Sequence, residues 1–185
     1  MTAPLTSSLA PDGVNASRSA YLIVGTLLTV FSFGLALLPR TGQLPPPAEA
    51  LLAPIVALVG LTALVWLSMV LVRNATILRG ITRADYYRDY QSFAPPEWVE
   101  RPARTFNNLL QVPVLFYLVC VLMLITRNLD QAQLDIAWTY VVMRVIHATI
   151  YIGWNNVTYR FASWVASCIT LGVLWVRFVM QSWPA

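Results

Sequence analysis

The stretch "TFNNLLQVPVLFYLVCVLMLIT", residues 105–126, contains no charged side chain. A helix needs roughly 20 predominantly apolar residues to cross the hydrocarbon core of a bilayer, and this stretch has that length. Two further runs without a charge, residues 19–39 and 50–72, reach the same length. The three runs together predict an integral membrane protein built from helices.

Two more apolar segments complete the predicted topology. Residues 136–154 are interrupted by Arg144 and His147, and residues 161–181 carry one charge, Arg177. The chain is 58% hydrophobic and 11% charged, whereas soluble domains carry about 25% charged residues. We therefore expect an all-α integral membrane protein with five spans and no soluble domain of useful size.

The arginines predict the orientation of these spans. Basic residues gather on the cytoplasmic side of membrane proteins. Six of the 12 basic residues fall in or beside the connection between the second and third spans: Arg73, Arg79, Arg83, Arg88, Arg101 and Arg104. This connection is predicted to be cytoplasmic, and the N-terminus with it. Since topology accounts for the net charge of +4, no nucleic-acid partner is expected.

The chain divides into four predicted parts. Residues 1–18 read as a flexible tail, residues 19–39 as an N-terminal transmembrane helix and residues 40–50 as a proline-rich connector, followed by a four-helix transmembrane domain over residues 51–182. The first run has an apolar core of about 19 residues, longer than the 7–15 residues typical of a signal peptide. It is therefore predicted to be an uncleaved helix.

The third predicted span begins with polar residues. Arg104, Asn108 and Gln111 have the spacing i, i+4 and i+7, which places them on one face of a continuous helix. Arg104 is near the cytoplasmic boundary, where its side chain can extend to the headgroups. Pro113 predicts a kink that frees a backbone carbonyl about one turn earlier.

A second polar face lies on the fourth span. Tyr140, Arg144, His147 and Tyr151 follow the same helical spacing. No predicted span contains an acidic residue, so Arg144 needs backbone carbonyls, tyrosines, water or an anionic ligand. The two faces either tie helices together or form a polar cleft, open to the cytoplasm, for a small anion. The chain has one histidine, and no metal site is expected.

Three quoted stretches resemble a known family. They are "RTFNNLLQVPVLFYLVCVL" from residue 104, "VVMRVIHATIYIGWNNVTYRF" from residue 141 and "LGVLWVRF" from residue 171. They are similar to the MAPEG family, the membrane-associated proteins of eicosanoid and glutathione metabolism, and in particular to its bacterial members of unassigned function. The resemblance extends over residues 51–177.

The resemblance implies a left-handed four-helix bundle that assembles as a homotrimer, with residues 19–39 as an additional helix. It also implies that glutathione is held between subunits near the cytoplasmic side. The implied ligand-binding residues are Arg104, Asn108, Gln111, Arg144, His147 and Tyr151. Gln111 stands where glutathione-using members have a glutamate that holds the ammonium group. Arg160 is similar to the arginine that stabilises the glutathione thiolate, which is the implied catalytic role.

Two functions are compatible with these residues. The first is a glutathione or related thiol transferase or peroxidase in the bacterial inner membrane, acting on a lipophilic electrophile from the bilayer. The alternative is a non-catalytic protein that uses the fold to bind lipid or a partner in a larger membrane complex. The neutral side chain of Gln111 and the additional N-terminal helix favour the alternative.

Overall fold

The computed structural model describes residues 22, 24–32, 34–35, 45–91 and 94–182. Residues 24–32 are helical. The labelled elements that follow are the 3₁₀ turn η1 (Ala48–Leu51) and the helices α2 (Leu52–Leu78), α3 (Tyr86–Asp89), α4 (Glu97–Leu109), α5 (Pro113–Thr126), α6 (Gln131–Ile152) and α7 (Val157–Ser182). The described part of the chain contains no strand, in agreement with the all-α prediction.

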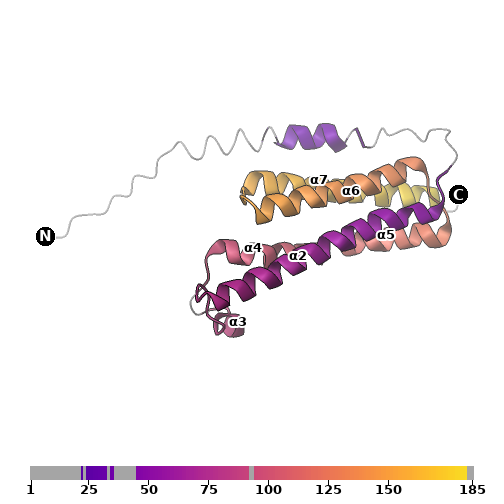
Figure 1. The fold of residues 1–185 in the computed structure, drawn as a ribbon. Helices are drawn as coiled ribbons and strands as arrows, with labels where there is room; N and C mark the ends of the chain where they lie inside the picture. Colours follow the sequence, from indigo (N-terminus) through magenta and orange to yellow (C-terminus); the bar gives the residue numbers. More distant parts are fainter. Residues whose placement is uncertain (1–21, 23, 33, 36–44, 92–93, 183–185) are drawn as a thin grey trace.

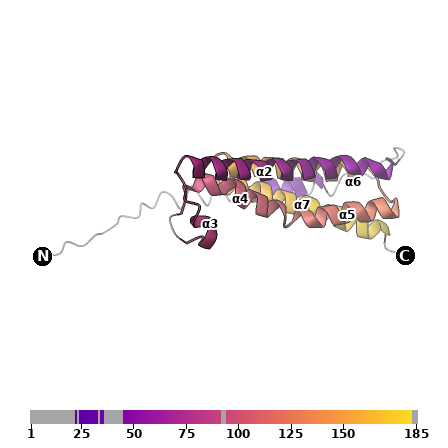
Figure 2. The same cartoon turned by 60° about the horizontal axis from the view of Figure 1, so that its bottom comes forward.

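The labelled helices form a four-membered bundle (Figure 1). Helix α6 lies beside α7, and α2 lies along α4 and α5, which together make one member. In the rotated view of Figure 2 the long helices run along a common direction. Short connections join α5 to α6 and α6 to α7, which places consecutive helices antiparallel. The predicted all-α fold is confirmed. The predicted bounds of the four parts of the chain stay predictions, and those for residues 1–18 and 40–44 lie outside the described residues.

Three helical segments of the described chain are long and apolar enough to cross a membrane: Ala48–Leu78, Glu97–Thr126 and Val157–Ser182. Helix α6 has 22 residues but is not among them, because Arg144 and other polar residues lower its mean hydropathy. The chain is a multi-pass membrane protein. The count of five spans stays a prediction, since the first run falls largely on residues that are not described.

The third predicted span is broken, and it begins earlier than expected. Helix α4 starts at Glu97, before the predicted run of residues 105–126, ends at Leu109, and gives way to turn residues before α5 begins at Pro113. Proline has no N–H to donate to a carbonyl one turn earlier, so the predicted kink is a full interruption. The prediction that Gln111 shares a continuous helix face with Arg104 is therefore wrong.

The apolar core fills the half of the bundle nearest η1. Phe116 of α5 stacks on Tyr140 of α6 with ring centroids 4.6 Å apart, and both rings are completely buried. Leu58 of α2 and Leu174 of α7 complete the cluster. A smaller cluster of Val65, Leu109 and Ala148 lies further along the bundle. Polar groups are therefore concentrated beyond the main core, toward the end that carries the α6–α7 turn.

Hydrogen bonds fix the end of the bundle near η1. Asp130 caps α6 by accepting from the backbone N–H of Gln133, whose side chain accepts from the Asp130 N–H in return. The Gln133 amide also donates to Gln181 Oε1 at 2.8 Å. Arg177 Nη2 lies 3.4 Å from Asp130 Oδ2. The start of α6 is thereby tied to the last turns of α7.

Helix α3 is held against α2 and α4 at the opposite end. Arg73 Nη2 lies 3.3 Å from Glu100 Oε2, and its guanidinium carbon lies 4.7 Å from the centre of the Tyr87 ring. Burial, followed by the nearby Glu100 carboxylate, raises the pKa of Tyr87 above its ordinary value of 10.0. The tyrosine therefore keeps its proton at neutral pH and acts as a neutral ring under Arg73.

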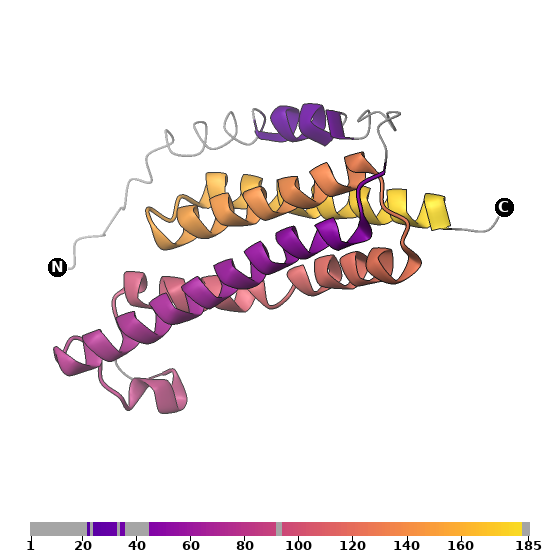
Figure 3. The same ribbon diagram turned by 45° about the vertical axis from the view of Figure 1, so that its right-hand side comes forward.

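The helical N-terminal segment, residues 24–32, lies along the α6–α7 pair, on the side away from α2 (Figure 3). Leu35 is 7% exposed, and Phe31 packs against the main core cluster. Thr29 donates to the carbonyl of Gly25 at 2.9 Å, which satisfies its hydroxyl within the segment. The described residues of the predicted additional helix thus contact the bundle itself.

Candidate functional site

A polar pocket of about 280 Å³ lies between α4, α6 and the first turns of α7. We call it the polar pocket; its lining residues are Asn108, His147, Tyr151, Val157, Arg160, Phe161 and Trp164. Four of the seven residues predicted from the sequence line it, from three different helices. The lining contains one guanidinium and no carboxylate.

Arg144 lies behind the pocket wall and is completely buried. Its Nη2 donates to the side-chain oxygen of Asn108 at 2.6 Å and to the Asn108 carbonyl at 3.0 Å. The helix break before Pro113 leaves this carbonyl without a regular helical partner, because its backbone donor, the N–H of Gln111, is 3.4 Å away. The predicted backbone acceptor for Arg144 is therefore present, and it arises from the interrupted helix.

This contact fixes the orientation of the Asn108 amide. A guanidinium only donates, so the oxygen of the amide must face Arg144. The Asn108 Nδ2–H₂ group is therefore not engaged by Arg144, and Asn108 lines the polar pocket. Nε and Nη1 of Arg144 are buried and have no hydrogen-bond partner among the described residues. A buried charge with incomplete hydrogen bonding is costly, so an acceptor near Asn108 would also lower the local electrostatic energy.

His147 connects α6 to α7. Its Nδ1 lies 3.0 Å from the carbonyl of Arg160 and 3.3 Å from Ser163 Oγ. A carbonyl only accepts, so Nδ1 carries the proton in this arrangement. Nε2 is buried and has no hydrogen-bond partner within the described residues. The first role of His147 is therefore to hold the backbone of Arg160.

Arg160 lies in the first turn of α7, because α7 begins at Val157, four residues before the predicted fifth apolar segment at residue 161. Its guanidinium carbon is 4.3 Å from the centre of the Tyr151 ring, and Nη1 donates to Asn155 Oδ1. The aromatic ring and the amide restrict a side chain that otherwise has many rotamers. A fixed positive charge therefore lies in the wall of the pocket.

Helix α4 holds the α6–α7 turn in place. Arg101 Nη1 donates to the Gly153 carbonyl at 2.6 Å, and Glu97 Oε1 accepts from the side-chain amide of Asn155. Asn155 has φ of 49°, a left-handed conformation that asparagine tolerates better than most residues. At Gly153 an added Cβ would lie 2.9 Å from the Thr149 carbonyl. The α6–α7 turn thus has Gly153 and Asn155 at its bends, and two hydrogen bonds hold it to α4.

The comparison with known families found one match. The model of the MAPEG family matches residues 51–180, which is more than half of the chain. The chain belongs to the MAPEG family. No curated protein and no solved structure matches it. All seven residues of the polar pocket fall inside the part that matches the MAPEG model, whereas the helical N-terminal segment precedes it.

Two residues expected from the MAPEG resemblance lie elsewhere. Arg104 and Gln111 are exposed, and neither lines the polar pocket. In the described part of the chain the Arg104 guanidinium has no hydrogen bond or ion pair. Arg104 lies about one helical turn before Asn108 on α4, and Gln111 lies in the turn between α4 and α5.

The sequence prediction missed three lining residues of this MAPEG chain: Val157, Phe161 and Trp164. Together with Arg160 they follow a helical spacing of three and four residues, so they form one face of α7. Phe161 and Trp164 are stacked, with centroids 6.4 Å apart. The signal was therefore present, but recognising it required knowing that α7 begins before Arg160.

Proposed function

We propose that this MAPEG protein binds an anionic thiol, glutathione or a related compound, in the polar pocket and transfers it to, or uses it to reduce, a lipophilic electrophile. The observation that supports the proposal is the convergence of Asn108, His147, Tyr151 and Arg160 on one pocket without a carboxylate. Such a lining favours a ligand with acceptor oxygens and negative charge.

The proposed roles follow from the geometry. Arg160 lowers the pKa of the bound thiol and so favours the thiolate, which is the nucleophile. Asn108, oriented by Arg144, donates Nδ2–H to a carboxylate or carbonyl oxygen of the ligand. Tyr151 holds the Arg160 guanidinium by its ring. Arg104 and Gln111 are exposed, so we assign them to contacts with the same ligand from a neighbouring subunit of a homotrimer.

The membrane setting is proposed from charge. The polar pocket lies toward the end of the bundle that carries Arg79 and Arg83, which the positive-inside rule assigns to the cytoplasm. We therefore place the pocket on the cytoplasmic side of a bacterial inner membrane, with the N-terminus on the same side. A thiol from the cytoplasm and an electrophile from the bilayer then reach the site from different directions.

The decisive experiment is titration calorimetry of the purified full chain with glutathione, for the wild type, Arg160→Ala and the control Arg79→Ala. Arg79 is an exposed arginine outside the pocket. We expect binding to the wild type and the control, and a loss on the order of a hundredfold for Arg160→Ala. Absence of binding to the wild type, or an equal loss in both variants, contradicts the proposal. Native mass spectrometry tests the trimer.

The second candidate is a non-catalytic subunit that binds a membrane partner. The contact between the N-terminal segment and the bundle favours it, because this segment lies outside the MAPEG match. Deleting residues 1–45 should then remove a co-purifying protein while the oligomer stays assembled. Unchanged recovery of the partner after this deletion counts against the second candidate.

A further inference from the structure

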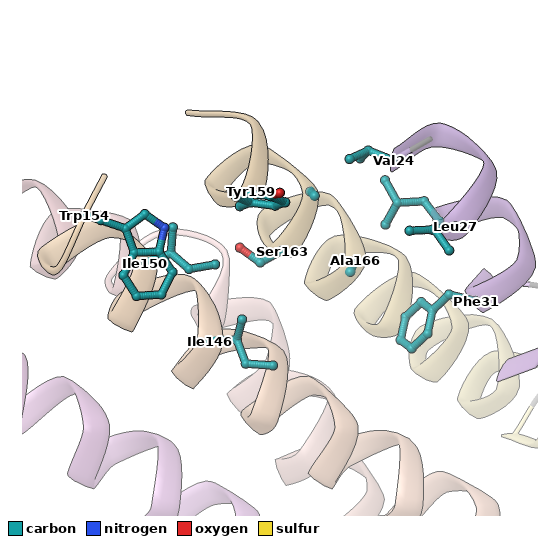
Figure 4. A pocket seen from close by; sticks show the side chains of 11 residues that line it. Val24, Leu27, Phe31, Ile146, Ile150, Trp154, Tyr159, Ser163 and Ala166 are labelled. Atoms are coloured by element: carbon teal, nitrogen blue, oxygen red, sulfur yellow. The ribbon is translucent and has the colours of Figure 1, made fainter. Parts of the chain in front are cut away.

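An apolar crevice of about 640 Å³ lies between the helical N-terminal segment, α6 and α7 (Figure 4). Its lining residues are Val24, Leu27, Leu28, Phe31, Ile146, Ile150, Trp154, Tyr159, Ala162, Ser163 and Ala166. None of these side chains is charged. The volume is within the usual range of about 300–1,000 Å³ for small-molecule sites.

Residue size explains why the space exists. Helix α7 presents small residues to the N-terminal segment: Ala162, Ser163 and Ala166. The facing side chains of Leu27 and Phe31 are large and stand across the crevice from them (Figure 4). Small residues on a membrane helix normally permit close contact with a neighbour, but here the two helices remain apart. A void between packed elements forfeits dispersion contacts, so an occupant stabilises the arrangement.

The chemistry of the lining excludes most occupants. The polar side chains are Ser163, Tyr159 and Trp154, and the Ser163 hydroxyl already donates to the Arg160 carbonyl at 3.0 Å. Water therefore finds few of the two to four partners that hold it in a buried site. A helix about 10 Å across could place only about 8 Å of its length in this volume, less than two turns. A thin hydrocarbon chain fits the same space.

Continuity with the lipid-facing surface identifies the source of that chain. Helix α7 is one of the helices suited to cross the membrane, and beyond the crevice it exposes Val176 and Met180. Trp154 is 64% exposed and Tyr159 58% exposed, both beside the α6–α7 turn. Tryptophan and tyrosine favour the headgroup level of a bilayer. These residues mark the end at which a polar headgroup would remain outside.

We infer that the apolar crevice binds one acyl chain of a membrane phospholipid, with the headgroup beside Trp154 and Tyr159. The lining offers no charged side chain to hold the carboxylate of a free fatty acid. The inference goes beyond the proposed function, because it requires neither thiol binding nor catalysis. It makes the N-terminal segment the outer wall of a lipid site that the part matching the MAPEG model does not form alone.

The site is tested with a phospholipid that carries a photoactivatable diazirine in one acyl chain. The full chain is reconstituted in bilayers containing this probe, irradiated and mapped by peptide mass spectrometry. We expect labelling concentrated on residues 24–31, on α6 near Ile146 and Ile150, and on α7 near Ala162. Labelling spread evenly over all lipid-facing helices overturns the inference, as does labelling by a diazirine fatty acid in place of the phospholipid.

Two filling variants and one matched control sharpen the test. Ala162→Phe fills the crevice from α7, and Leu27→Trp fills it from the N-terminal segment without altering the bundle. Each should lower labelling of the crevice on the order of tenfold, equivalent to about 1.4 kcal/mol. Val176→Phe adds the same ring to an exposed position of α7 and should leave labelling unchanged. Equal labelling in all variants, or crosslinks from the crevice to a second copy of the chain, rejects the phospholipid site.

Discussion

The polar pocket and the apolar crevice lie on opposite faces of the same turns of α7. Arg160 and Trp164 face the pocket, whereas Ala162 and Ala166 face the crevice. The pocket is framed by directed hydrogen bonds from α4 and α6, while the crevice is framed only by the sizes of apolar side chains. One helix thus separates the proposed site for an anionic thiol from the proposed site for an acyl chain.

The largest expected effect comes from replacing a hydrogen-bond donor in the polar pocket by an acceptor. Asn108→Asp gives Arg144 a carboxylate partner but removes the Nδ2–H group that is proposed to donate to the ligand. We expect anionic thiol binding, measured by calorimetry, to fall about a hundredfold, or about 2.7 kcal/mol. The melting temperature should rise, because the buried guanidinium gains an ion partner.

Labelling of the apolar crevice by the lipid probe serves as the control for Asn108→Asp and should not change. If Asn108→Asp lowers the melting temperature as well as the affinity for the thiol, the substitution has damaged the fold in general. That outcome contradicts the assigned orientation of Asn108.

Arg144→Met tests whether Asn108 needs its anchor. The substitution keeps an unbranched side chain but releases both acceptors of Asn108. Thiol affinity should fall about tenfold, since the amide then samples orientations that do not serve the ligand. Lysine should not restore the affinity, because it lacks the planar arrangement of donors. Affinity restored by Arg144→Lys shows that charge alone, without orientation, is required.

Asn155→Gly removes the amide that holds Arg160 but keeps a residue that tolerates the positive φ of 49°. We expect the KM for the thiol to rise about threefold, because the Arg160 side chain gains rotamer freedom. Asn155→Ala should show the same rise and a further loss of stability of about 1 kcal/mol from backbone strain. An unchanged KM in both variants shows that Asn155 does not support the polar pocket.

The smallest effect is expected at Gln111. Gln111→Glu places a carboxylate on an exposed position outside the pocket of its own chain. If a neighbouring subunit brings it to the ligand, affinity for glutathione rises about twofold, which corresponds to the free energy of about 0.4 kcal/mol expected for an exposed ion pair. N-acetylated glutathione, which lacks the ammonium group, should show no rise. An equal rise for both thiols contradicts an ammonium contact.

Much of the architecture followed from the sequence. Runs without charge predicted the membrane helices, and the helical spacing of Tyr140, Arg144 and His147 predicted the buried face of α6, since all three are nearly or completely buried. Pro113 predicted a kink, whereas the structure has an interruption between α4 and α5. The start of α4 at Glu97 was missed because charged residues precede the apolar run, and the strongly polar first turns resemble a loop.

The sequence by itself determined which residue types are available at the membrane boundary and the order in which the helices present them. Only the tertiary structure decided that Nη2 of Arg144 donates to Asn108 and that His147 holds the backbone of Arg160. Spacing along a helix fixes the direction of a side chain but not its distance from another helix. Those distances arise from packing, and here the break before Pro113 exposes the carbonyl that Arg144 binds.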